Sequence, residues 1–143
     1  MAANPLALDQ QLCFALYSTS LAMTKLYKPL LDDLGLTYPQ YLAMLVLWEN
    51  DGIPLKQLAQ RLHQDSGALT PVVKRLEALD LLRRRRDPSD ERNLAIELTE
   101  AGRALKAKAV SVNAAIGLAC GLDDQGLGEL RSELTALRAR LEA

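Results

Sequence analysis

Leucines recur at spacings of mostly three and four residues, or multiples of these, along residues 6–34, which predicts a long amphipathic helix. The positions that carry this pattern are Leu12, Leu16, Leu26, Leu30 and Leu34. Gly35 is placed to end the helix as the left-handed residue beyond its last turn. Thr37 followed by Gln40 has the spacing of a capping box, so a second helix is predicted from Thr37 to Asn50.

Two shorter helices are predicted next. Pro54 suits the first turn of a helix whose apolar face contains Leu55, Leu58 and Leu62. After a break at residues 63–65, a fourth helix is predicted to end near Leu79. Its apolar stripe consists of Leu69, Val72, Val73, Leu76 and Leu79. Pro71 lies near the front of this stripe and has no N–H, so the helix start is expected to be irregular or late.

Residues 82–86 and 94–98 are predicted to be strands, and Asp87-Pro88-Ser89-Asp90 between them has the composition of a turn. Thr99 is placed to cap a fifth, alanine-rich helix that reaches about Cys120. Gly121 ends it, and Asp123 caps a sixth helix that extends to Leu141. The pattern therefore predicts a mainly α protein with one small β-hairpin.

Composition places this chain among soluble single-domain proteins. It has 143 residues, of which 49% are hydrophobic and 24% charged. Neither a membrane span nor a secretion signal is predicted, so we expect a cytoplasmic protein whose two cysteines stay reduced. The sequence contains no glycine-rich phosphate loop, metal-ligand spacing or Ser/His/Asp set, and the single histidine, His63, is interpreted as a polar turn residue. We therefore expect no enzyme activity, no cofactor and no metal.

Charge is uneven along the chain. Residues 56–92 contain nine Lys or Arg and six Asp or Glu, a net charge of +3, within a chain of net charge −1. This basic segment coincides with two short helices followed by an arginine-containing hairpin, the layout of a winged helix-turn-helix that binds DNA. A solvated charged face, or a strand edge protected by charge, is the alternative interpretation.

The second helix of the pair is expected to contact base edges, and the hairpin is expected to reach the minor groove. In a strand, Arg84 and Arg86 share one face and Arg83 and Arg85 share the other, so at least two of these arginines can face phosphate. Which of them does so stays open. The predicted DNA-binding residues of this segment are Ser66, Thr70, Lys74, Arg75, Arg84, Arg86 and Arg92.

Asp90-Glu91-Arg92 followed by Leu98-Thr99 is similar to the wing signature of MarR-family regulators, and the helix arrangement resembles that family over residues 1–143 as one domain. The resemblance implies a homodimer held by residues 6–34 and 99–143. It also implies that residues 53–98 form the lobe that binds double-stranded operator DNA. Residues 65–71 resemble the recognition-helix start of the OhrR-type branch of that family, so Ala68 joins the predicted DNA-binding residues, and Asp90 joins them through the wing signature.

Residues 12–17 resemble the reactive-cysteine segment of the OhrR-type organic hydroperoxide sensors, in their two-cysteine subgroup. The resemblance implies that Cys13 senses, that Cys120 resolves, and that Tyr27 and Tyr38 contact the sensing sulfur. Independently of the resemblance, Tyr17 lies one helical turn after Cys13 and can donate to its sulfur. Tyr27 lies about 21 Å along the helix from Cys13, so it would act from the partner subunit. A small buried hydrophobic role for either cysteine is the alternative.

The expected function is that of a repressor that releases operator DNA when an organic hydroperoxide oxidises Cys13, in a pocket lined by Phe14 and the tyrosines. A disulfide with Cys120, expected to belong to the other subunit, would complete the switch. Three rival functions stay open: a MarR-type repressor gated by a small phenolic or acidic ligand, a thiol peroxidase, and a structural protein that bridges DNA.

Overall fold

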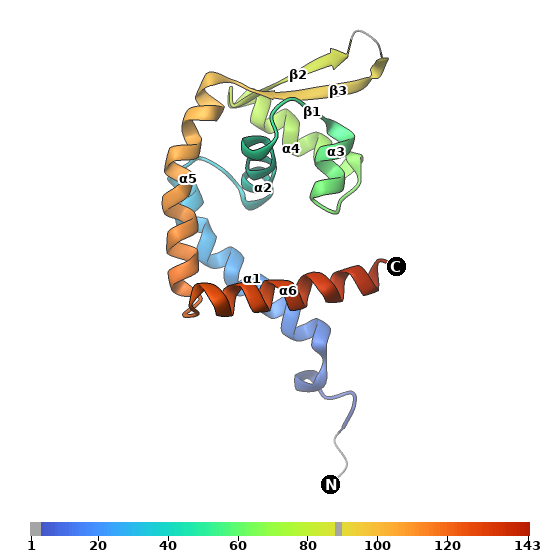
Figure 1. Ribbon diagram of the computed structural model, residues 1–143, viewed down its shortest axis with the longest axis vertical. Helices are drawn as coiled ribbons and strands as arrows, with labels where there is room; N and C mark the ends of the chain where they lie inside the picture. Colours follow the sequence, from blue (N-terminus) through green and yellow to red (C-terminus); the bar gives the residue numbers. More distant parts are fainter. Residues whose placement is uncertain (1–3, 88–89) are drawn as a thin grey trace.

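The computed structural model describes residues 4–87 and 90–143, with the side chains of Asp87 and of residues 90–93 excepted (Figure 1). A short 3₁₀ helix, Leu8–Gln10, precedes the main elements. These are α1 (Leu12–Asp32), α2 (Tyr38–Glu49), β1 (Ile53–Pro54), α3 (Leu55–Arg61), α4 (Ser66–Ala78), β2 (Leu82–Asp87), β3 (Asp90–Leu98), α5 (Glu100–Ala119) and α6 (Asp124–Leu141).

The described elements form a lobe and an extended helical region. Helices α2, α3 and α4 lie beneath a three-stranded antiparallel sheet of order β1-β3-β2 (Figure 1). Helix α5 leaves this lobe along one side, and α1 and α6 lie at its far end (Figure 1). The fold is therefore a winged helix-turn-helix lobe joined to three longer helices.

Side-chain caps fix where the helices begin. Thr37 and Gln40 form both bonds of the predicted capping box, and Thr99 and Asp123 cap α5 and α6 as predicted. Gly35 has φ 71°, the left-handed conformation expected of a residue that ends a helix. These signals could be predicted from the sequence because each cap joins residues three apart and Gly35 acts alone.

The structure corrects three sequence predictions. Helix α1 begins at Leu12 and not at residue 6, because Leu8–Gln10 forms a separate 3₁₀ turn. Residues 53–54 form β1, which pairs with β3 through Ile53 and Ile96. Helix α4 starts at Ser66, neither late nor displaced by Pro71, because the Asp65 carboxylate accepts the Ala68 N–H at 2.8 Å and sets the first turn before the proline.

The hydrophobic core is concentrated in the lobe. Fully buried side chains come from α2, α3, α4 and the sheet, and they include Met44, Leu47, Leu58, Leu69, Leu76, Leu82 and Ile96. The long helices contribute less: Leu31 is the buried residue of α1, and every residue of α6 is exposed or half-buried. The core therefore holds the lobe rigid and leaves much of α1 and α6 uncovered.

Large apolar side chains remain exposed on the long helices. They include Leu12, Leu16, Leu21 and Leu26 of α1, Val110 and Leu118 of α5, and Leu130, Leu134 and Leu141 of α6. Large apolar side chains gathered on the same three helices are typical of a surface that binds a partner.

Within the described residues, no single helix is long and apolar enough to cross a membrane, although α5 and α6 meet that test together as a pair bent by 90°.

Candidate nucleic-acid interface and cysteine sites

Helix α4 places polar side chains opposite its buried stripe. Leu69, Val73 and Leu76 pack into the core. The remaining faces expose Ser66, Ala68, Lys74 and Arg75, all of which were predicted to bind DNA. Thr70 differs, because it is half-buried and its hydroxyl donates to the carbonyl of Ser66 at 2.9 Å. The exposed face of α4 can therefore offer hydroxyl and cationic donors to a polyanion.

The wing is the β2–β3 hairpin, and the arginines of β2 lie on both faces of that strand. Register pairs Arg83 with Glu97 and Arg84 with Ile96, so Arg84 lies on the face that carries the buried Ile96. Arg83, Arg85 and Arg86 are exposed, and Arg85 forms an ion pair with Glu97 at 2.7 Å. The predicted contacts of Asp90 and Arg92 rest on side chains that the structure does not describe.

Arg84 was predicted to bind DNA, but its side chain is engaged within the lobe. Its Nε donates to Glu77 Oε1 at 3.0 Å, and its Nη2 lies 2.9 Å from the same oxygen. Hydrogen bonds from the Arg84 side chain and backbone, together with its charge, outweigh desolvation and lower the pKa of Glu77 below its usual value. The Glu77 carboxyl therefore stays ionised at neutral pH.

Cys13 lies at the start of α1, where it is the second residue of the helix and is exposed. Phe14 and Tyr17, which follow it, are also exposed. The first turn of a helix carries backbone N–H groups without helical partners, and these groups favour a negatively charged neighbour. An exposed thiol in this position is accessible to a small oxidant.

Three tyrosines form a cluster where α1 meets α2. The ring centroids of Tyr27 and Tyr38 are 4.9 Å apart in an edge-to-face arrangement, and those of Tyr27 and Tyr41 are 5.7 Å apart. Burial, followed by the charges of Tyr38, Tyr41 and Cys120, raises the pKa of Tyr27 to about 12. The Tyr27 hydroxyl therefore keeps its proton at neutral pH and remains a hydrogen-bond donor.

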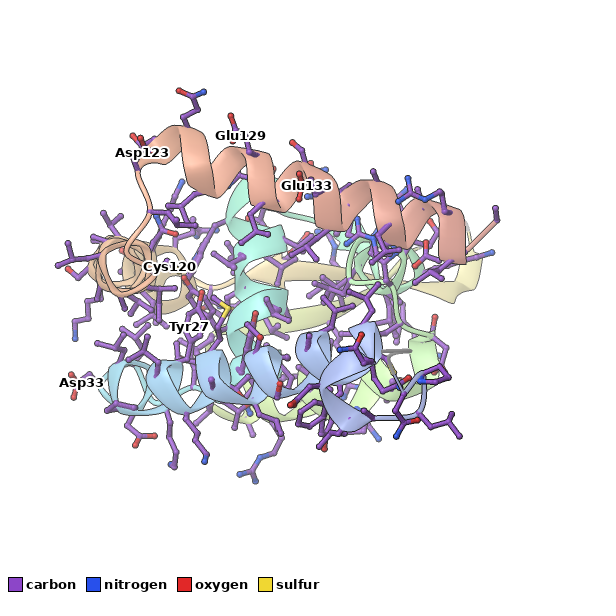
Figure 2. All side chains as sticks on the ribbon, turned by 90° about the horizontal axis from the view of Figure 1, so that it is seen from below. Tyr27, Asp33, Cys120, Asp123, Glu129 and Glu133 are labelled. Atoms are coloured by element: carbon purple, nitrogen blue, oxygen red, sulfur yellow. The ribbon has the colours of Figure 1, made fainter. Side chains whose placement is uncertain are left out.

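Cys120 lies at the C-terminal cap of α5, is exposed, and approaches Tyr27 of the same chain (Figure 2). Cys13, in contrast, is 14 residues before Tyr27 on α1, about 21 Å away along a helix. Within one chain, the predicted redox residues thus fall into two groups. Cys13, Phe14 and Tyr17 form one, and Tyr27, Tyr38 and Cys120 form the other.

Sequence reasoning missed the joint between the lobe and α5. Trp48 Nε1 donates to the carbonyl of Gly102 at 2.8 Å, and the Asp51 carboxylate accepts the N–H of Leu98 at 2.8 Å. Arg103 Nη1 lies 3.6 Å from Asp51. The partners in these three contacts are 47 to 54 residues apart, so no local pattern could have indicated them.

Among the described residues, no group of three or more His, Cys, Asp or Glu side chains is arranged to hold a metal ion.

Comparisons with known proteins agree with this geometry. A family model of SarA/Rot transcriptional regulators matches residues 25–109. The organic hydroperoxide resistance transcriptional regulator of Bacillus subtilis is 48% identical over 135 residues, which are 94% of this chain and 90% of that protein.

Solved structures show the same similarity. Reduced AbfR bound to DNA is 34% identical, with a TM-score of 0.75 and 92% of both chains covered; AbfR comes from Staphylococcus epidermidis. CouR of Rhodococcus jostii RHA1, bound to p-coumaroyl-CoA, is 27% identical, with a TM-score of 0.78 and 92% and 94% of the two chains covered. From this sequence identity and shared winged-helix fold, we conclude that the chain belongs to the MarR family of transcriptional regulators, in its OhrR-type group.

Proposed function

We propose that this regulator is a homodimeric repressor that binds operator DNA in its reduced form and releases it when an organic hydroperoxide oxidises Cys13. The observation that carries the proposal is the position of Cys120 beside Tyr27, at the opposite end of α1 from Cys13. A dimer that brings one chain's Cys13 to the other chain's tyrosines also brings it to that chain's Cys120.

The dimer follows from the uncovered apolar surface. Residues 6–34 and 99–143 carry most of the exposed leucines, and a two-fold interface would cover the same patch on both chains. Two-fold symmetry then presents two copies of α4 and two wings to a pseudo-palindromic operator. The exposed residues Ser66, Ala68, Lys74, Arg75 and Arg86 are the proposed contacts, with Arg92 and Asp90 in the wing.

The intersubunit arrangement follows from distance. A disulfide requires Cα atoms within about 7 Å. Cys13 is separated from its own Tyr27, and therefore from the neighbouring Cys120, by about 21 Å of helix. The tyrosines that donate to the sulfur of Cys13 are therefore Tyr27 and Tyr38 of the partner subunit, while Phe14 and Tyr17 line the approach from its own helix.

The chemistry uses two thiols in sequence. The Cys13 thiolate attacks one peroxide oxygen, an S–O bond forms, the O–O bond breaks, and the alkoxide leaves as an alcohol after taking a proton. Cys120 of the partner subunit then attacks the sulfenic sulfur, an S–S bond forms, and water leaves. An external thiol reverses the disulfide by exchange. The bond draws helices α1 and α5 together and changes the spacing of the two lobes.

The known structures support a conformational difference between the two states. The TM-score of this chain is 0.75 against reduced, DNA-bound AbfR and 0.64 against disulfide-formed AbfR, at 34% and 35% identity. Overoxidised AbfR bound to DNA also gives a TM-score of 0.75, so the fold described here is more similar to the DNA-bound forms of AbfR than to the disulfide form.

A Cys120→Ser variant is expected to react with hydroperoxide but to form no intersubunit disulfide. It should accumulate sulfenic acid on Cys13, detected by dimedone labelling and mass spectrometry, or a more oxidised or thiol-capped product. Its affinity for operator should fall less than that of the wild type. A disulfide-linked dimer of this variant on a non-reducing gel would remove Cys120 as the resolving residue.

The ligand-bound CouR structure favours a second candidate function, a repressor gated by a small molecule. Dependence on Cys13 separates the two candidates, because a ligand-gated repressor would respond to its ligand whether or not the thiol is present.

DNA binding is tested with a duplex that the reduced wild-type protein selects from a random 30-bp library. We expect an inverted-repeat sequence, a complex with two chains per duplex by native mass spectrometry, and an affinity that falls as salt rises. Selection of no common sequence would contradict the repressor and favour a structural DNA-binding role.

A further inference from the structure

The contact between Glu77 and Arg84 joins the recognition helix to the wing. Besides the two side-chain contacts, the backbone N–H of Arg84 donates to Glu77 Oε2 at 3.0 Å. One carboxylate of α4 thus holds both the side chain and the main chain of β2. The side chains of Glu77 and Arg84 are about one-third exposed, at 35% and 30%, so water screens this pair less than the pair of Arg85 with Glu97, whose arginine is 71% exposed.

The backbone between the two residues is also fixed. Asp80 has φ 60°, the N–H of Leu81 donates to the carbonyl of Leu76, and the N–H of Asp80 donates to that of Glu77. These bonds form a Schellman motif, which sets the direction in which the chain leaves α4. Because β2 is an edge strand, the N–H of Arg84 has Glu77 as its partner in place of a neighbouring strand.

We propose that Glu77 and Arg84 are positioning residues that fix the angle between the wing and the recognition helix, and that Arg84 supports operator binding through Glu77 without contacting phosphate itself. The inference rests on the proposed DNA-binding function. Arg84 lies two residues before Arg86 on the same strand face, so the direction of the exposed Arg86 follows from where Arg84 is held.

Removing the charge of Glu77 separates this role from a simple electrostatic one. Loss of a negative charge near DNA should by itself strengthen binding. The positioning role predicts the opposite for Glu77→Gln: about a tenfold weaker affinity for the selected operator, with little change for a scrambled duplex of the same composition. Unchanged or tighter operator binding by Glu77→Gln would overturn the proposal.

Glu97→Gln is the matched control. Glu97 pairs with Arg85 on the opposite face of the same hairpin, so this variant also removes one negative charge from the wing but leaves α4 untouched. We expect it to bind the operator at least as tightly as the wild type. A loss equal to that of Glu77→Gln would show that charge, and not the joint to α4, governs the effect.

The salt dependence of binding identifies the role of Arg84. A residue that contacts phosphate lowers the salt slope by about 1 when it is removed. We expect Arg84→Gln to weaken operator binding as much as Glu77→Gln, with an unchanged slope, and the double variant to be no weaker than either single one. If the losses of affinity of the two single variants add up in the double variant, or if Arg84→Gln has a reduced salt slope, Arg84 contacts phosphate directly and the proposal is wrong.

Two further comparisons keep these outcomes distinct. The first is thermal unfolding, which tests whether each variant folds. The second is Glu77→Asp, which keeps the charge but shortens the side chain, and which should lose specificity for the operator if the contact with Arg84 fixes the angle of the wing. If the wild-type protein itself selects no operator, the proposed function fails. If the wild-type protein selects an operator, and Glu77→Gln and Glu77→Asp bind that operator with the same specificity, the inference about Glu77 and Arg84 fails but the proposed function stands.

Discussion

A Cys13→Ser variant is expected to remain bound to the selected operator after treatment with an organic hydroperoxide, under conditions in which the affinity of the wild-type protein falls at least tenfold. Serine replaces sulfur with oxygen in a side chain of nearly the same shape, but its hydroxyl is not oxidised by a peroxide. Fluorescence anisotropy of the labelled duplex, before and after one equivalent of cumene hydroperoxide, measures both affinities.

The reduced variant serves as its own control, because its affinity before treatment should equal that of the reduced wild type. Cys13 is exposed on α1, away from the α4 and wing residues proposed to contact DNA, so no direct effect on binding is expected. Release of Cys13→Ser by hydroperoxide would contradict thiol sensing at this position.

Gly102→Ala is expected to lower the free energy of unfolding by about 3 kcal/mol, at the upper end of the usual cost of overpacking. A Cβ atom at Gly102 would lie 2.0 Å from the carbonyl oxygen of Leu81 and 3.2 Å from Leu98 Cδ2. The backbone oxygen cannot turn away as a side chain could, so α5 must shift from the lobe. Trp48, the single tryptophan, donates to the carbonyl of Gly102, and its fluorescence in urea titrations reports the change.

Gly117→Ala, in the same helix, is the control. A Cβ atom there meets nothing within 4 Å. Alanine is a better helix former than glycine by about 0.5–1 kcal/mol, so this variant should be slightly more stable than the wild type when both are measured at one protein concentration. Equal stability of Gly102→Ala and Gly117→Ala would show that the approach of α5 to Leu81 is not constrained.

The order of the elements was predictable because their signals are local. Leucine spacing indicated α1 and α6, and the Thr37, Thr99 and Asp123 caps indicated where α2, α5 and α6 begin. The start of α1 and the strand at Ile53 were not predicted. The first depends on a 3₁₀ turn that leaves leucine periodicity intact, and the second on pairing with Ile96, more than 40 residues away.

The site was predictable in its residue types more than in its contacts. Resemblance to the OhrR-type regulators selected Cys13 and Cys120, and distance along a helix separated Cys13 from Tyr27. The arginine run, however, did not reveal that Arg84 differs from its neighbours. Its role depends on Glu77, a residue of the preceding helix whose side chain reaches the strand only after the chain has turned at Asp80.

The most direct test of the account is operator binding before and after one equivalent of organic hydroperoxide, with a non-reducing gel on the same samples. We predict loss of binding together with a dimer-sized band on the gel. A thiol reductant should abolish the band and restore binding, and a digest of the band should contain a peptide pair linked by a Cys13–Cys120 disulfide. Loss of binding without that band would contradict the intersubunit disulfide. Retention of binding by fully oxidised wild-type protein would contradict the redox switch itself.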